Sequence, residues 1–435
     1  MSQILQTELE SKVIRRLTWR LVPFLFLLYV AAYLDRINVS FAALQMQREL
    51  HFNDAVYGFG AGLFFVGYFC FQVPSNIVLQ RVGARRWIAL LMIVWGFVST
   101  SMLLVQTVMG FYGLRFLLGA AEAGFFPGVI LYLRNWFPDS ARARTVARFM
   151  TAAPIAGVIG SPVSGALLNL HQRWGLSGWQ WLFLMEGLPA ILLGSVVWIY
   201  LTDRAQEAEW LEPRERAWLL DALESKTQAN RDSRPTGTFV ALRDPRMWML
   251  ALVYFGLTTV MYGIGLWLPT LIHSVSGVGN FGIGLLSAIP YLAAAISMVM
   301  VGLHSDHTRE RRWHTALPAF IGAAALVVVA YSTSVGLSVA AISVALLCAF
   351  SSMGPFWAMP TTVLSGTAAA VGIALINSVG NLGGFAGPWV IGAIKKATGT
   401  FQDGILVVAA GLAVAGAIVL MINLSGKGTA LALDQ

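Results

Sequence analysis

Long apolar stretches separated by short polar segments dominate this chain. A membrane-spanning helix needs about 20 mostly apolar residues, and twelve stretches of the sequence meet that requirement. Their expected limits are residues 20–43, 56–80, 86–105, 108–133, 144–170, 179–201, 246–272, 280–303, 313–332, 335–361, 367–393 and 403–424. The pattern therefore predicts an all-α integral membrane protein with twelve transmembrane helices.

One long polar interruption, from Thr202 to Arg246, divides the predicted spans into two sets of six. We expect a first six-helix bundle over residues 1–201, a cytoplasmic linker over 202–245 and a second six-helix bundle over 246–435. The stretch around Trp210 to Leu223 is typical of an amphipathic helix within the linker.

The two halves share short motifs at matching places. The segment Tyr57–Gly60 opens the second span and Arg85–Trp87 opens the third, as Phe281–Gly284 and Arg311–Trp313 do for the eighth and ninth. These pairs predict an internal repeat of about half the chain. Two pseudo-symmetric bundles around a cavity at the membrane midplane are the layout of a secondary transporter.

Composition and charge agree with this class. Only 11% of the 435 residues are charged, whereas soluble proteins carry roughly 25%. The net charge of +8 is better explained by membrane topology than by nucleic acid binding, because basic residues gather in cytoplasmic loops. If the N-terminus lies in the cytoplasm, the external loops contain only four basic residues, Arg48, Arg173, Lys395 and Lys396. We therefore expect both termini in the cytoplasm and no cleaved signal peptide.

Other kinds of site find little support. Cys70 and Cys348 lie in apolar stretches, so we expect packing roles and no disulfide framework. His304, Asp306 and His307 have metal-binding side chains but lie in a basic loop without a convincing fourth ligand, so we expect no metal site. A phosphate-binding loop ending in Lys-Ser or Lys-Thr is missing from the sequence, which disfavours an ATP-driven pump. We expect no cofactor, and energy from a proton gradient.

Five ionisable side chains fall within predicted spans: Asp35, Arg36, Arg115, Glu122 and Glu186. A charge at the bilayer centre costs at least about 2.5 kcal/mol, so each must be paired, solvated or neutral. A rise of about 1.5 Å per residue places Asp35 and Arg115 at the same depth, about 9 Å below the outer edge, so we expect them to pair. Glu122 lies two turns deeper on the same helix face as Arg115.

Two arginines and two carboxylates in one half suit a proton-coupled anion site. Arginine orients a substrate carboxylate, while Asp35 and Glu122 change protonation. We favour this role over a structural ion-pair network, because the second half of the repeat lacks such charges. For Glu186 a structural role is at least as well supported. Polar or aromatic residues of the spans could complete the cavity, although packing and interhelical contacts also explain them: Tyr33, Tyr68, Trp357, Asn377 and Asn381.

Several motifs resemble a known family. Leu17–Pro23 followed by Tyr33–Asn38 resembles the first span of the anion:cation symporter family within the major facilitator superfamily. Arg115–Gly128, followed by Trp136–Pro138, resembles the fourth-span signature of that family, and Gly302–Arg312 resembles the superfamily's loop between spans 8 and 9. The resemblance runs from about residue 12 to residue 424. It implies a proton-coupled importer of organic anions in the bacterial cytoplasmic (inner) membrane.

The resemblance also implies roles for single residues. Asp35 and Glu122 match the family's proton-coupling carboxylates, Arg36 its substrate-binding arginine and Arg115 the arginine that pairs with the aspartate. The positions that match sugar-acid contacts of galactonate-type members are Tyr33, Tyr68, Trp357 and Asn377. Ala153 stands where those members carry a glutamine, a departure from the sugar-acid pattern.

Together these observations predict a secondary active transporter that imports a small organic carboxylate by proton symport with alternating access. Sugar acids, tartrate-like acids and aromatic acids all remain candidate substrates. An organic-anion uniporter or exchanger without proton coupling is the alternative within this fold. A membrane-embedded transferase or a nutrient sensor would need an acid/base cluster or an added domain, so we expect no enzyme. The expected partners of the protein are the organic anion, protons and the lipid bilayer. We expect no nucleic acid partner, and we expect the protein to be a monomer.

Overall fold

The computed structural model describes residues 2–231, 242–363 and 366–422, and within these ranges the regular structure is helical. The helices of the first half and the linker are α1 (Ser2–Glu49), α2 (Asp54–Val82), α3 (Ala84–Ser101), α4 (Val108–Glu122), α5 (Phe125–Trp136), α6 (Asp139–Met150), α7 (Ala152–Leu167), α8 (Gly178–Tyr200) and α9 (Pro213–Arg231). Those of the second half are α11 (Pro245–Val275), α12 (Asn280–Thr308), α13 (Trp313–Tyr331), α14 (Val335–Ser351), α15 (Met353–Ala358), α16 (Pro360–Val363), α17 (Gly366–Asn381), α18 (Gly383–Thr398) and α19 (Gln402–Met421). Short 3₁₀ turns occur at Met102–Leu104, Leu168–Leu170, Arg173–Gly175 and Ala205–Glu207.

The predicted membrane spans are confirmed, and several of them consist of more than one helix. Within the described residues, 11 helical segments are long and apolar enough to cross a membrane. The predicted span over residues 367–393 corresponds to α17 and α18, each of 16 residues, which meet at Leu382. Glycines on both sides of this break, Gly380 and Gly383, pack against Tyr254 and the backbone of Phe255 on α11. The interrupted helix completes the twelve-span architecture.

Polar segments show the largest differences from the predicted helix limits. Helix α1 begins at Ser2 and runs for 48 residues, because its polar first part packs along the linker rather than ending at the membrane. Helix α9 begins at Pro213 instead of Trp210, since proline suits the first turn of a helix. Trp210 precedes the helix and stacks on Trp136 of α5, with ring centroids 5.5 Å apart.

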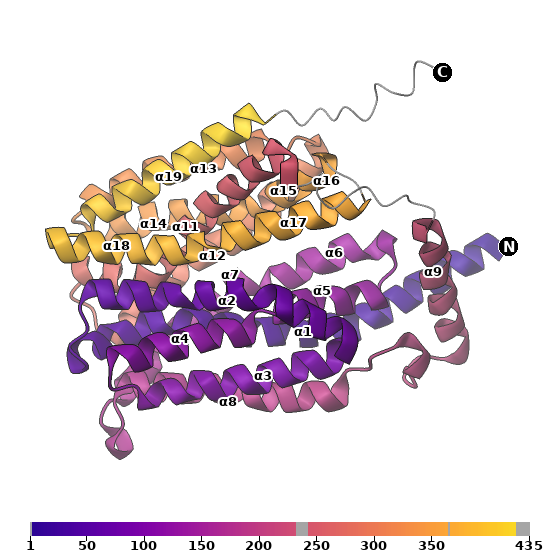
Figure 1. Ribbon diagram of the computed structural model, residues 1–435, viewed down its shortest axis with the longest axis horizontal. Coiled ribbons are helices and arrows are strands. Elements are labelled where there is room, and N and C mark those ends of the chain that lie inside the picture. The colour runs from indigo at the N-terminus through magenta and orange to yellow at the C-terminus, as the bar shows by residue number, and fades with distance from the viewer. Residues whose placement is uncertain (1, 232–241, 364–365, 423–435) are drawn as a thin grey trace.

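The two halves form separate bundles that pack side by side. Figure 1 shows α1 to α8, in indigo to magenta, below α11 to α19, in orange to yellow. The main contacts between the bundles are α2 with α18 and α7 with α12. The N-terminus and α9 lie at one end of the bundles, which we call the α9 end; the other is the opposite end.

Contacts between the bundles hold the opposite end together. Lys395 pairs with Asp54 at 2.9 Å, and Arg48 donates to Nε2 of His273 at 3.1 Å. A Cβ atom added to Gly58 would lie 2.4 Å from the carbonyl oxygen of Pro388. Because only glycine permits this approach, backbone packs directly on backbone between α2 and α18. The opposite end is therefore closed in this structure.

Other contacts fasten the linker to the first bundle at the α9 end. Arg16 and Lys12 of α1 pair with Glu215 of α9, at 2.7 and 3.2 Å. The guanidinium of Arg20 lies over the rings of Tyr200 and Trp210, at 4.9 and 4.7 Å from their centroids. The polar start of α1 and the linker therefore form one docked unit.

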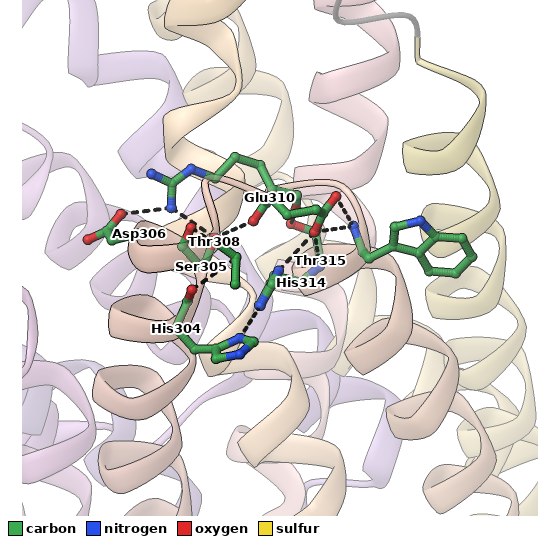
Figure 2. A network of polar contacts seen from close by, with 9 residues as sticks. His304, Ser305, Asp306, Thr308, Glu310, His314 and Thr315 are labelled. Carbon is green, nitrogen blue, oxygen red and sulfur yellow. Dashed lines mark hydrogen bonds and ion pairs between the residues drawn. The ribbon is translucent and has the colours of Figure 1, made fainter.

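A second polar network holds the loop between α12 and α13 (Figure 2). Asp306 pairs with Arg311 at 2.7 Å, while His304 contacts His314, which in turn contacts Glu310 at 2.8 Å. The Glu310 carboxylate also accepts the amide N–H of Trp313 and so caps α13. Of the side chains that resembled metal ligands in the sequence, His304 and Asp306 thus take part in separate pairings of the loop.

The two cysteines differ in their surroundings. Cys348 is buried within the second bundle, as expected. Cys70 is exposed, because its face of α2 points away from both bundles. The packing role predicted for Cys70 is therefore wrong.

Candidate transport site

Arg36 connects the two bundles near the middle of the molecule. Its Nη2 donates to Oε2 of Glu122 on α4 at 2.8 Å, and its Nη1 donates to the hydroxyl of Tyr262 on α11 at 3.0 Å. Arg36 is only 9% exposed and Glu122 1%. The desolvation cost of a buried ion pair can exceed its Coulombic gain, but removing one partner leaves a costly unpaired charge.

The predicted ion pair between Asp35 and Arg115 is wrong. Asp35 instead accepts hydrogen bonds from Ser99 at 2.5 Å and Trp95 at 3.2 Å, both on α3. Successive residues of a helix point about 100° apart, so Arg36 faces the second bundle while Asp35 faces α3. Equal depth in the membrane does not fix this direction around the helix axis.

Arg115 is fully buried beside the same cluster. Its Nη2 donates to the carbonyl oxygen of Ala61 at 3.0 Å, whereas Nε and Nη1 have no hydrogen-bond partner among the described residues. The ring of Phe64 lies between two guanidinium groups, with its centroid 5.1 Å from Arg36 and 5.3 Å from Arg115. This arrangement concentrates positive charge at one point, where an anion is attracted.

Tyrosines from both bundles surround Arg36. Tyr33 and Tyr68, predicted from the sequence, are buried, and the Arg36 guanidinium lies 5.6 Å from the Tyr68 ring centroid. Further tyrosines near Arg36 were missed from the sequence: Tyr29, Tyr254 and Tyr262. Tyr254 occupies the place of Tyr29 in the second half of the repeat. This match between the halves is the sequence feature that could have identified Tyr29 and Tyr254.

Trp357 and Asn377 lie on the second bundle's side of the site. The Trp357 ring packs edge-on against Tyr254, with centroids 4.9 Å apart. Asn377 accepts a hydrogen bond from the Asn381 amide at 2.8 Å, one turn along α17. Tyr254 also packs against Gly380, so this part of α17 reaches the tyrosine cluster.

Glu186 is separate from Arg36 and Glu122. It lies on α8, is 5% exposed, and accepts a hydrogen bond from Ser164 of α7 at 2.6 Å. The structure thus brings Arg36, Glu122, Tyr33 and Tyr68 together and places Asp35 and Glu186 deeper inside the first bundle.

Two pseudo-symmetric helical bundles that meet around buried charges define a secondary transporter, and the protein is a multi-pass membrane transporter rather than an enzyme. The chain belongs to the Major Facilitator Superfamily, whose family model matches residues 25–388. The membership expected from the sequence motifs is confirmed.

Named relatives are similar over nearly the whole chain. A protein of Agrobacterium vitis named "Putative tartrate transporter" is 49% identical over 419 residues, covering 96% of this chain and 93% of the relative. A Pseudomonas putida protein named "Putative metabolite transport protein NicT" is 45% identical over 390 residues, 88% of each chain. A solved inward-facing, unoccupied bacterial homolog of the human lysosomal transporter Spinster has a TM-score of 0.75 and 18% identity, covering 92% of this chain and 95% of that one. This last likeness concerns the fold alone.

Proposed function

We propose that the protein imports a small organic anion of the tartrate type together with protons. The observation that carries the proposal is the Arg36 guanidinium, which is buried between Glu122 and Tyr262. Relatives named as tartrate transporters, 49% identical over 96% of this chain, support the substrate class. Tyrosine hydroxyls around Arg36 suit the hydroxyl groups of such an acid.

Competition for Arg36 provides the coupling in this proposal. A substrate carboxylate and ionised Glu122 both need the same guanidinium, so binding of one disfavours the other. Protonated Glu122 gives up its charge and leaves Arg36 to the anion. Proton binding and anion binding therefore favour each other, and this linkage is what symport requires.

Asp35 is the second proton-binding group in this proposal. Its hydrogen-bond donors, Ser99 and Trp95, are both neutral. Burial without a cationic partner penalises the charged form of a carboxyl group. Asp35 therefore exchanges a proton when the site is exposed to water.

The proposed orientation follows the distribution of basic residues. Cytoplasmic loops of bacterial inner-membrane proteins are rich in lysine and arginine, which places the α9 end inside together with both termini. In that orientation the closed opposite end faces outward, and closure there supports release of substrate toward the α9 end at this stage of the proposed cycle. Opening of the opposite end then receives the anion and protons for the next cycle.

Uptake of labelled tartrate into proteoliposomes with an imposed pH gradient tests this function. We expect Glu122→Gln and Asp35→Asn to lower gradient-driven accumulation at least about tenfold, while counterflow exchange of tartrate, which needs no net proton movement, is retained. Driven accumulation that persists in both variants contradicts the coupling.

The pH of the outer solution during uptake by the wild-type protein distinguishes proton symport from transport without proton coupling. Symport predicts alkalinisation of the outer solution during uptake, whereas a uniporter or exchanger of organic anions predicts none.

A thermal-shift comparison of tartrate, galactarate and phthalate identifies the substrate class. No stabilisation by any of these acids would contradict the organic-anion assignment.

A further inference from the structure

Glu186 is a buried carboxyl group in the middle of a membrane span that the transport site described above does not use. One oxygen accepts the hydroxyl of Ser164 at 2.6 Å, while Oε2 has no hydrogen-bond partner among the described residues. Ionisable groups inside a membrane span are rare and costly. A purely structural contact with Ser164 needs only an amide or a hydroxyl at this position.

A second polar side chain lies between Glu186 and Asp35. Asn38 of α1 is completely buried next to Glu186. Neither its amide nitrogen nor its oxygen forms a well-aligned hydrogen bond within the described part of the chain. Asn38 follows Asp35 by three residues, so the two side chains share one face of α1. Two polar atoms of Asn38 thus lie buried next to Glu186, on the face of α1 that also carries Asp35.

The surroundings of Glu186 contain little other charge. Helix α1 contributes Asn38 and Asp35, α7 contributes Ser164, and α3 packs on α8 through Gly96 and Thr100. Asp35, which is in electrostatic contact with Glu186, is the titratable group among these neighbours. No described ion pair involves either carboxyl group, and the other charged groups in electrostatic contact with Asp35 are Glu122 and Arg115.

We infer that Glu186 is a third proton-binding group of the transport cycle and exchanges its proton with Asp35 past Asn38. In this step the Glu186 carboxyl group gives its proton to the Asp35 carboxylate through a water molecule bonded to the Asn38 amide. Glu186 becomes a carboxylate and Asp35 becomes neutral. The solution at the opposite end returns a proton to Glu186 when the bundles open there. This inference rests on the proposed proton symport.

The Glu186→Gln variant tests the inference, because glutamine keeps the shape and accepts the Ser164 hydrogen bond but carries no proton. We expect gradient-driven tartrate accumulation to fall at least about fivefold while tartrate counterflow and thermal stability stay near the wild-type values. Ser164→Ala is the matched control, since it removes the hydrogen bond and keeps the carboxyl group. We expect this control to retain driven accumulation.

The uptake and counterflow measurements on these variants either support or contradict the proposed role of Glu186. Driven accumulation of Glu186→Gln equal to the wild type overturns the inference, and so does an equal loss of driven uptake and counterflow, which marks a structural role. If glutamine prevents folding, Glu186→Asp gives a second measurement: we expect driven uptake with an altered pH profile, and a profile identical to the wild type overturns the inference. Wild-type uptake without any response to the pH gradient would instead refute the proposed symport.

Discussion

Arg36 forms hydrogen bonds with one carboxylate and one hydroxyl group in this structure. Its two terminal nitrogens bond to groups on different bundles, Glu122 and Tyr262. A planar guanidinium can bind a carboxylate with two parallel hydrogen bonds, whereas a lysine ammonium acts as a point charge. The proposed substrate therefore meets a donor of matching shape and not only a positive charge.

Arg36→Lys is expected to weaken tartrate binding at least about tenfold, or roughly 1.4 kcal/mol, because the bidentate geometry is lost. Isothermal titration of the purified protein with tartrate measures this change. Arg115→Lys is the control, since Arg115 is equally buried but bonds to the backbone of Ala61. Equal losses of affinity in the two variants would contradict a special role for Arg36.

The sequence could identify these charged residues but not their partners. Hydrophobic flanks place Asp35, Arg36, Arg115 and Glu122 inside the membrane, and helix rise gives their depth. The choice between Asp35–Arg115 and Arg36–Glu122 depends on which helix lies beside each face of α1. That neighbour relation arises from tertiary packing, and the same limit hid Tyr262.

Among the elements, α9 and the polar start of α1 have the best-defined docking contacts. Burial works to raise the pKa of Glu215, but the Glu212 amide N–H and the Lys12 and Arg16 cations outweigh it, so this pKa lies below the ordinary value. A lowered pKa in the docked state means that the contact is fully stabilising above the ordinary glutamate pKa. The stabilisation is lost as the pH falls through the lowered value.

Acidification below about pH 4, near the ordinary pKa of glutamate, is therefore expected to release α9 from α1. Glu215→Gln is expected to have the same effect at neutral pH, seen as faster amide hydrogen exchange in α9. Asp221→Asn removes an equal charge from an exposed position of the same helix and should change the exchange little. Unchanged exchange in Glu215→Gln would show that the ion pairs do not hold the linker.

Apolar spans were predicted more accurately than polar helices for a physical reason. A membrane span must be long and apolar because lipid offers no hydrogen bonds, so composition alone identifies it. The polar part of α1 around Lys12 and Arg16 is held instead by ion pairs with Glu212 and Glu215 at the start of α9. The break between α17 and α18 at Leu382 depends on how closely Gly380 and Gly383 approach α11, which the span pattern does not encode.

For the whole molecule, closure of the opposite end rests on a few polar contacts and on glycine packing. Lys395 pairs with Asp54 across the bundles and also lies over the Phe401 ring, 4.0 Å from its centroid. The two side chains are partly exposed, so solvent reduces the strength of the pair. The repeat in the sequence predicted two bundles, but which helices meet between them became visible only from the packing of α2 on α18 and α7 on α12.

Lys395→Gln is expected to shift the equilibrium toward opening of the opposite end by about 1 kcal/mol, roughly a fivefold change in population. The distance between spin labels placed at the opposite ends of α2 and α18 reports this shift. Lys396→Gln, at the exposed neighbouring position, is the control. An unchanged distance distribution in Lys395→Gln would show that the pair is not part of the closure.

The glycine contact between α2 and α18 has an electrical consequence. Backbone packed on backbone at Gly58 and Pro388 leaves no room for water between these residues, so this contact is a barrier to ions between the two ends of the bundles. Each elementary charge that crosses the membrane gains or loses about 2.3 kcal/mol per 100 mV. Voltage therefore acts on any transport step that moves net charge past this contact.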